Sequence, residues 1–195
     1  MPDSFIRLIG TRCLFTFAVQ MQAVIVAWQV YALTHDPLML GLVGLAEAAP
    51  ALSLALYGGM IVDRGNPLFV YRCVLALSFV SAAALIVSHL PGLELALTAQ
   101  LTTLYLASVM TGIARAFSQP AMFSLVPRLV ARENLTRAAA WMSSSMQLAR
   151  VAGPAVGGLV YGYFGMLAAI VAVCVLLALG IGLVRRCGSW HIRPA

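Results

Sequence analysis

Apolar residues along this chain occur in long blocks, separated by short groups of charged and turn-forming residues. The blocks are about 20 residues long, which is the length that a helix needs to cross the hydrocarbon core of a bilayer. An amphipathic surface helix would instead show a narrower apolar stripe. The pattern therefore predicts six membrane-spanning helices, at about residues 8–33, 38–62, 70–90, 95–117, 137–162 and 164–184.

Residues that favour turns stand between most of these blocks. They occur at residues 34–37, 63–67, 89–92 and 162–165. Pro120 and Pro127 are expected to interrupt a longer connection after the fourth span, because proline lacks the backbone N–H that a helix interior uses. The expected fold is therefore all-α, a single six-helix transmembrane bundle over residues 1–195.

Arginine positions predict which ends of the spans face the cytoplasm, because arginine collects in the cytoplasmic loops of membrane proteins. If the N-terminus is inside, eleven of the twelve arginines fall in cytoplasmic segments: Arg7, Arg12, Arg64, Arg72, Arg115, Arg128, Arg132, Arg137, Arg185, Arg186 and Arg193. The three external loops hold none, and Arg150 lies within a span. This alternation predicts that both termini are cytoplasmic.

Composition supports a membrane protein and excludes other classes. Hydrophobic residues make up 62% and charged residues 9% of the chain, whereas soluble domains carry about 25% charged residues. The net charge of +6 comes from arginines scattered among apolar blocks, which do not form the basic face of a nucleic-acid-binding protein. The four cysteines have no CxxC spacing, so neither a metal site nor a disulfide framework is expected.

The predicted spans also lack the groups that an intramembrane enzyme needs. His35 and His89 fall in external loops and His191 in the tail, so no intramembrane serine has a histidine on another span. No paired-aspartate motif and no nucleotide-binding loop occur. We therefore expect no enzymatic activity, no cofactor and no direct use of ATP.

Arg150 is the residue with the strongest physical argument for a role in function. A cation at bilayer depth costs about 2.5–3.5 kcal/mol on the lenient insertion scale, and such a residue normally faces an internal cavity. Ser143, Gln147, Arg150 and Pro154 share one helix face. Arg150 and Gln147 are therefore candidates for an anion-attracting or coupling site. A salt bridge between spans, or a shifted span whose arginine reaches the interface, would also explain the residue.

Other polar residues within the spans are weaker candidates. Glu47 is the only carboxylate inside a predicted span; it could pair with Arg150 or act as a protonatable coupling group, because burial favours the neutral acid. Gln22 and Gln29 share a face of the first span, and Tyr105 shares a face of the fourth with two threonines. These side chains either line a cavity or form hydrogen bonds between helices.

Three motifs stand on the second, fourth and fifth predicted spans. Residues 41–50 and 58–64, which include Gly59 and Asp63, resemble the loop between spans two and three of the major facilitator superfamily, whose pattern is G-x-x-x-D-R-x-G-R-R. Residues 112–127 resemble span four and its exit in the enterobactin-exporter-like branch, and residues 153–158 resemble the span-five motif G-P-x-x-G-G of drug:proton antiporters. The three motifs stand in the family's order and on the matching spans.

The resemblance implies a fold and a function. The fold would be an N-terminal six-helix half built of two inverted three-helix repeats, and a faint likeness between residues 50–62 and 154–160 fits such repeats as well as chance. The function would be secondary active efflux of a small molecule by alternating access, across a bacterial cytoplasmic (inner) membrane, with a proton as a candidate coupling ion. The implied gating residues are Gly59, Asp63, Arg64 and Arg115, and the implied hinge, for which static packing is the alternative, is Gly153, Pro154, Gly157 and Gly158.

The chain departs from the family pattern in places. Asn66 replaces the second glycine of the loop motif, and Pro67 and Leu68 replace its two basic residues. Asparagine tolerates a left-handed turn, so the bend is expected to survive although the gate loses two cations. Ser108 stands where antiporters often carry an arginine, so proton coupling through that arginine is not expected.

Length is the largest departure, because superfamily transporters have twelve spans in two halves. A truncated or frameshifted product, a two-fold homodimer and a separately encoded second half each explain a six-span chain. The alternative function is that of a non-transporting remnant or a structural membrane protein.

Overall fold

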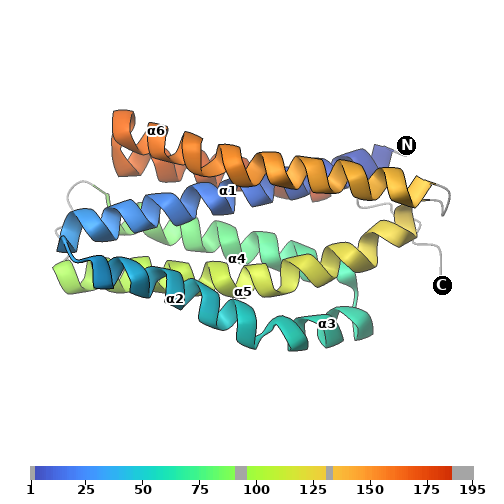
Figure 1. The fold of residues 1–195 in the computed structure, drawn as a ribbon, viewed down its shortest axis with the longest axis horizontal. Coiled ribbons are helices and arrows are strands. Elements are labelled where there is room, and N and C mark those ends of the chain that lie inside the picture. The colour runs from blue at the N-terminus through green and yellow to red at the C-terminus, as the bar shows by residue number, and fades with distance from the viewer. Residues whose placement is uncertain (1–2, 91–95, 131–133, 186–195) are drawn as a thin grey trace.

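The computed structural model describes residues 3–90, 96–130 and 134–185, and the regular structure of this part is entirely helical (Figure 1). The helices are α1 (Asp3–Thr34), α2 (Pro37–Ser53), α3 (Ala55–Arg64), α4 (Pro67–Ser88), α5 (Leu97–Leu129) and α6 (Leu135–Arg185). Most of them lie side by side along the long axis of the bundle. Arg132, Arg186 and Arg193, which mark sidedness in the sequence, lie outside the described residues.

The apolar blocks form helices of membrane-spanning length, as predicted. Within the described part, α1, α4, α5 and α6 are each long and apolar enough to cross a bilayer, and α2 and α3 pass the same test as a pair bent by 44°. Pro50 lies inside α2, about one turn before the break at Leu54. A proline removes a backbone hydrogen bond and clashes with the preceding turn, which explains a bend at this point.

Helix α6 is a hairpin of two helical segments that meet at Gly165, where φ is 78° and ψ is 178°. The first segment follows α1 in the same direction, because the Cys13 thiol lies near the Ser145 carbonyl and the Tyr161 hydroxyl donates to Gln29. The second segment runs back, and its residues 180–183 lie against Gly10 and the neighbouring threonine. The beginning of α1 and the end of α6 are therefore at the same end of the bundle.

Short polar residues begin two of the helices. The Asp36 carboxylate accepts a hydrogen bond from the Leu38 N–H at the start of α2. The Asn66 side chain accepts from Leu68 and Phe69 at the start of α4, and its φ is −92°. The chain turns from α3 into α4 at Asn66 without using the left-handed conformation that asparagine tolerates, because its side chain caps α4 from an extended backbone conformation.

The prolines of helix α5 do not have the effect that was expected from the sequence. Pro120 and Pro127 lie inside this helix, which continues to Leu129 and is not interrupted after residue 117. A proline costs a helix one backbone hydrogen bond and some steric strain, and tertiary packing can compensate. Here the intervening residues Met122 and Leu125 are each 1% exposed, so their packing against the bundle holds the helical path.

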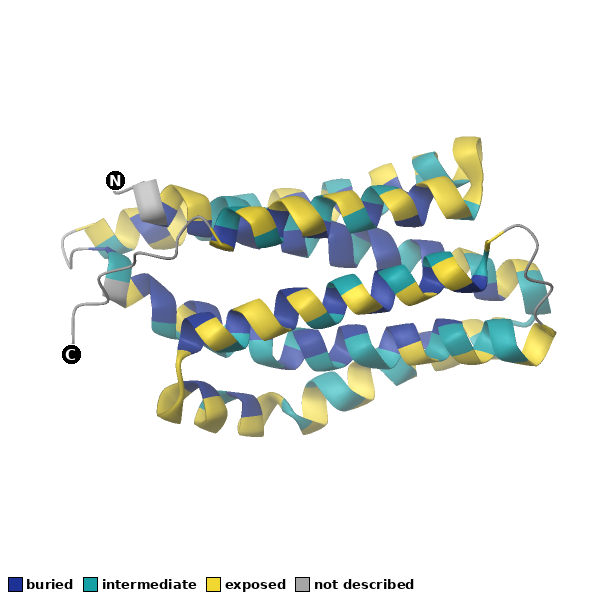
Figure 2. Ribbon diagram, turned by 180° about the vertical axis from the view of Figure 1, so that it is seen from behind, coloured by how far each residue is buried: buried dark blue, intermediate teal, exposed yellow. Residues whose placement is uncertain are grey.

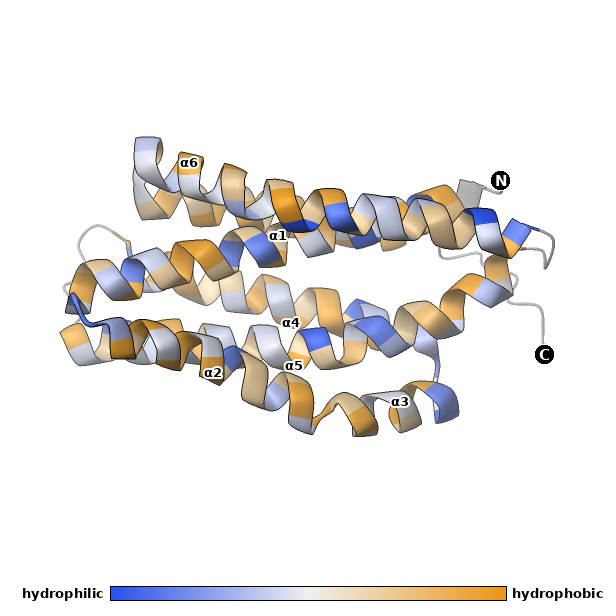
Figure 3. Ribbon diagram, viewed as in Figure 1, coloured by the Kyte–Doolittle hydropathy of each residue, from blue (hydrophilic) through white to orange (hydrophobic). Residues whose placement is uncertain are grey.

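Helix α1 occupies the middle of the bundle, packed mainly along α6 and also against α2 and α5, while α5 packs against α4 and α2. Buried positions face the interior of the bundle and exposed positions its outer sides (Figure 2). Apolar residues extend around most helices (Figure 3), and Leu52, Leu56 and Val151 are large, apolar and exposed. A surface of this kind suits contact with lipid chains.

Candidate transport site

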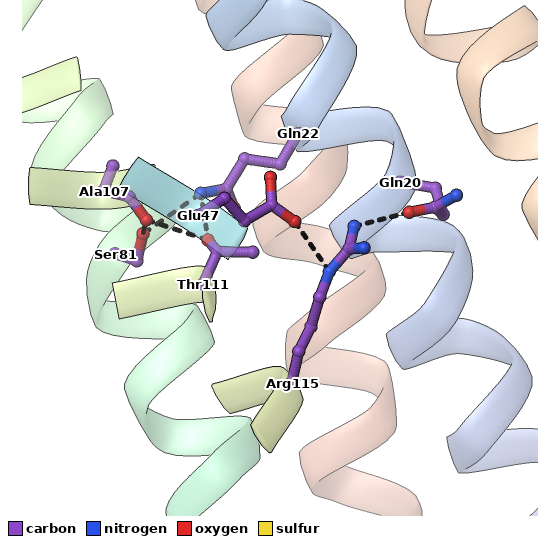
Figure 4. Close-up of polar contacts among 7 residues, drawn as sticks. All are labelled: Gln20, Gln22, Glu47, Ser81, Ala107, Thr111 and Arg115. Atoms are coloured by element: carbon purple, nitrogen blue, oxygen red, sulfur yellow. Dashed lines mark hydrogen bonds and ion pairs between the residues drawn. The ribbon is translucent and has the colours of Figure 1, made fainter. Parts of the chain in front are cut away.

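An ion pair between α2 and α5 lies within the bundle. The Arg115 Nε and the Glu47 Oε1 are 2.8 Å apart, and Arg115 also donates through Nη2 to the Gln20 side-chain oxygen on α1 (Figure 4). The Glu47 side chain is 16% exposed and that of Arg115 36%, so the pair is partly shielded from solvent. It joins three helices at one level. The described partner of Glu47 is thus Arg115, and the structure gives no contact between Glu47 and Arg150.

A second polar group joins α1, α4 and α5. The Gln22 side-chain amide donates to the Ser81 hydroxyl at 3.0 Å and to the Thr111 hydroxyl at 3.2 Å. Both hydroxyls in turn donate to the Ala107 carbonyl (Figure 4). Gln22 is 2% exposed. The geometry is that of hydrogen bonding between helices, the alternative to cavity lining that the sequence left open.

Gln29 and Tyr105 also make contacts between helices. The Gln29 side-chain oxygen accepts from the Tyr161 hydroxyl of α6 at 2.8 Å. The Tyr105 hydroxyl of α5 donates to the Met39 carbonyl of α2 at 2.9 Å. Both contacts lie toward the end of the bundle where α1 leads into α2. They connect the polar groups of these spans to neighbouring helices.

The polar stripe of α6 faces a cavity of about 500 Å³ between α5 and α6. Ser143, Gln147 and Arg150 line it together with Gln119 of α5 and with apolar side chains, among them Phe123. Arg150 is exposed, and its Nη1 lies 3.3 Å from the Gln147 side-chain oxygen. Arg150 therefore has an amide from its own helix as its described partner.

A smaller cavity of about 210 Å³ adjoins the first and shares Gln119 and Arg150 with it. Three arginines from three helices line this space: Arg12 of α1, Arg115 of α5 and Arg150 of α6. Arg12 is 3% exposed and donates to the Ser118 carbonyl at 2.8 Å and to the Gln119 side-chain oxygen at 2.6 Å. Its described partners are thus uncharged.

The sequence profile of the Major Facilitator Superfamily matches residues 8–189. The chain belongs to the Major Facilitator Superfamily. It is also similar to the Staphyloferrin A transporter of Staphylococcus aureus (strain NCTC 8325 / PS 47), with 26% identity over 134 residues. That match covers 68% of this chain and 32% of the relative, so it spans about a third of the relative's length. The superfamily is one of multi-pass membrane transporters and not of enzymes, which agrees with the expectation from the sequence.

The superfamily's loop motif lies at the end of α3. Asp63 and Arg64 are exposed there, and the Asp63 carboxylate accepts from the Ser124 hydroxyl of α5 at 3.4 Å. Gly59 is half-buried, with open space around it. Arg115 does not join this group, because it pairs with Glu47. The structure therefore places three of the four implied gating residues at one helix end and the fourth in the ion pair.

The superfamily's glycine motif lies where α6 meets α1. A Cβ added to Gly153 would lie 2.9 Å from the Gln20 Cβ, and one added to Gly157 would lie 2.8 Å from the Met21 Cγ. These two glycines therefore permit a close approach of the helices. Gly158 faces open space, and Pro154 is half-buried. In this conformation the motif serves close helix packing.

Arg12 is the residue that sequence reasoning missed. The alternation of arginines groups Arg12 with the cytoplasmic segments, although it stands within the predicted span 8–33. Its position inside an apolar block is the same signal that singled out Arg150. Arg115 is likewise grouped with the cytoplasmic arginines, although it stands inside the predicted span 95–117, near its end.

Proposed function

We propose that this chain forms one wall of a secondary transporter that exports a small molecule across a bacterial cytoplasmic membrane by alternating access. The observation that carries the proposal is the polar stripe of Arg150, Gln147 and Ser143, which lines a cavity of about 500 Å³ between two helices of membrane-spanning length. Polar groups at this depth are costly unless they serve a pathway or a partner. Membership in the Major Facilitator Superfamily and the similarity to a bacterial transporter support the same function.

We further propose six membrane passes with both termini cytoplasmic. Helix α6 has 51 residues, more than twice the roughly 20 that one crossing needs, and its reversal at Gly165 divides it into two passes. With α2 and α3 as one bent pass, the described helices make an even number of crossings. That the beginning of α1 and the end of α6 share one end of the bundle supports this count. Two inverted three-helix repeats would then form the wall.

Glu47 is proposed as the protonatable coupling group. Its carboxylate is bound by Arg115, and Arg115 in turn contacts Gln20. Protonation of Glu47 would remove one charge from a pair that joins three helices, and would leave Arg115 free to bind another acceptor. A change of this kind can bias a bundle between two conformations.

Alternating access needs a second wall, for which we propose either a second six-helix half or a second copy of this chain. The exposed end of α3, with Gly59, Asp63 and Arg64, is proposed to close the cytoplasmic side against that partner. The close contacts of Gly153 and Gly157 with α1 are proposed to guide the relative movement of the two helices. Export as the direction follows from the likeness of the span-four and span-five motifs to exporters.

The test is reconstitution. The chain would be placed in liposomes alone and together with a matching second half, and the release of a panel of fluorescent amphipathic compounds would be followed under an imposed pH gradient. We expect release above that of protein-free liposomes in at least one combination. No release in any combination would contradict the proposal and favour a structural membrane protein.

Coupling is tested separately with Glu47→Gln. This variant is expected to lose the stimulation by the pH gradient while it retains exchange of internal for external substrate. Unchanged stimulation in Glu47→Gln would show that Glu47 is not the coupling group, and it would leave the transport proposal itself intact.

A further inference from the structure

The arginines around the smaller cavity have more positive charge than the described residues there can balance. Arg12, Arg115 and Arg150 all line the cavity of about 210 Å³. Glu47 balances Arg115. The described side-chain partners of Arg12 and Arg150 are uncharged: two amides, a hydroxyl and a thioether. Two guanidinium charges therefore meet at this cavity without a described carboxylate of their own.

From this arrangement we propose that the cavity binds the oxyanion group, a carboxylate or a phosphate, of an amphipathic small molecule. A guanidinium presents paired N–H donors that match two oxygens of such a group. An anion between Arg12 and Arg150 would also relieve the repulsion between like charges in a region of low dielectric. The inference rests on the proposed function, since it names the class of substrate that the transporter would take.

The two cavities suit a ligand that has a charged part and an apolar part. The smaller cavity holds the arginines, while the larger one, of about 500 Å³, is lined mainly by apolar side chains, including Met122, Phe123 and Met142. Both share Arg150 and Gln119, so a ligand can reach from one into the other. An oxyanion head would lie among the arginines, and an apolar body would lie between α5 and α6.

Arg12 and Arg150 would have different roles in binding. Arg12 is almost fully buried and held by Ser118 and Gln119, so it supplies a preorganised charge at the base of the cavity. Arg150 is exposed and bonded only weakly to Gln147 among the described residues, so it can turn toward an entering anion. Arg115 would become available to the ligand when its contact with Glu47 is released.

The test measures binding, without transport, on the whole chain in nanodiscs of uncharged phosphatidylcholine. Equilibrium dialysis would compare labelled benzoate and phenyl phosphate with benzamide, a neutral compound of similar shape. We expect both anions, or one of them, to bind at least tenfold more tightly than benzamide. The ratio of the two anions assigns the oxyanion. Equal binding of benzamide and the anions, or no binding of either anion, would overturn the inference.

Variants locate the site. Arg150→Gln is expected to weaken anion binding at least tenfold, and Glu47→Gln, which frees Arg115, is expected to strengthen it. Arg72→Gln is the matched control, because it removes the same charge from an exposed arginine that lines a different groove, between α4 and α6. An equal loss in Arg72→Gln and Arg150→Gln would mean nonspecific attraction and would overturn the inference.

The outcome separates this inference from the proposed function. Specific anion binding without transport in any combination would support the site and contradict the transporter. Transport that Arg150→Gln leaves unchanged for every anionic compound would contradict the site and support the transporter.

Discussion

Gly112 of α5 packs directly against the backbone of Glu47 in α2, so closely that a Cβ added to Gly112 would lie 2.1 Å from the Glu47 carbonyl oxygen. Arg115 follows Gly112 by three residues, about one helical turn, and reaches the Glu47 carboxylate from that position. The absence of a side chain at Gly112 therefore sets the helix separation at which the ion pair forms.

Gly112→Ala is expected to destabilise the protein by about 1–3 kcal/mol, the usual cost of an extra group in a packed interior. The added methyl group would meet backbone atoms, which cannot turn away as a flexible side chain can. Thermal unfolding in detergent measures the change. Gly59→Ala is the control, because its added Cβ meets nothing within 4 Å; an equal loss in both variants would contradict the packing argument.

The ion pair of Glu47 and Arg115 is expected to show energetic coupling. In a double-mutant cycle of Glu47→Gln, Arg115→Gln and the double variant, contacting residues typically give an interaction energy of about 0.5–3 kcal/mol. The stability losses of the two single variants should together exceed the loss in the double variant, because each single variant leaves one charged group without its partner. The same cycle with Arg150→Gln in place of Arg115→Gln should be additive, and coupling there would contradict the observed pairing.

Gly157 and Gly158 are adjacent but are expected to respond differently to substitution. Gly157→Ala places a Cβ 2.8 Å from the Met21 Cγ, 3.1 Å from its Cα and 3.1 Å from its carbonyl oxygen, and should cost about 1–3 kcal/mol as an overpacked contact. Gly158→Ala points into open space and should gain up to about 1 kcal/mol, because alanine favours a helix more than glycine does.

Transport by the same two variants distinguishes packing from a hinge. If the motif serves only close packing, Gly158→Ala should transport at the wild-type rate. A large loss of transport in Gly158→Ala, with stability retained, would instead indicate that bending at this position is required.

Substitutions of Arg150 and Arg12 are expected to differ in their effects on transport and on stability. Arg150→Gln should change stability by no more than about 0.5 kcal/mol, as is usual for exposed positions, and should reduce transport of an anionic compound at least tenfold. Arg12→Gln should cost about 1.5–3 kcal/mol, because Arg12 is buried and its guanidinium makes hydrogen bonds typical of charged groups. Unfolding in detergent and transport in liposomes together measure both effects. If unfolding of Arg150→Gln accounts for its whole loss of transport, the assignment of Arg150 to substrate binding is contradicted.

Much of the architecture follows from local properties of the chain. Membrane-spanning helices follow from hydrophobicity summed over blocks of about 20 residues, and this sum does not depend on which helices become neighbours. The stripe of Ser143, Gln147 and Arg150 is likewise a consequence of helical periodicity alone. The effects of Pro120 and Pro127 could not be inferred in this way, because packing of the turns around them decides whether a helix survives a proline.

The candidate site depended on distances between segments that are far apart in the sequence. The sequence offered Arg150 as a partner of Glu47, whereas the close approach of α5 to α2 at Gly112 brings Arg115 to it. Arg12 lies more than 100 residues from Ser118, which accepts its hydrogen bond. The sequence by itself determined a helical membrane protein with an arginine, Arg150, inside one of its apolar blocks. The tertiary structure alone brought three arginines to one cavity, because electrostatic interactions depend on separation in space and not on position along the chain.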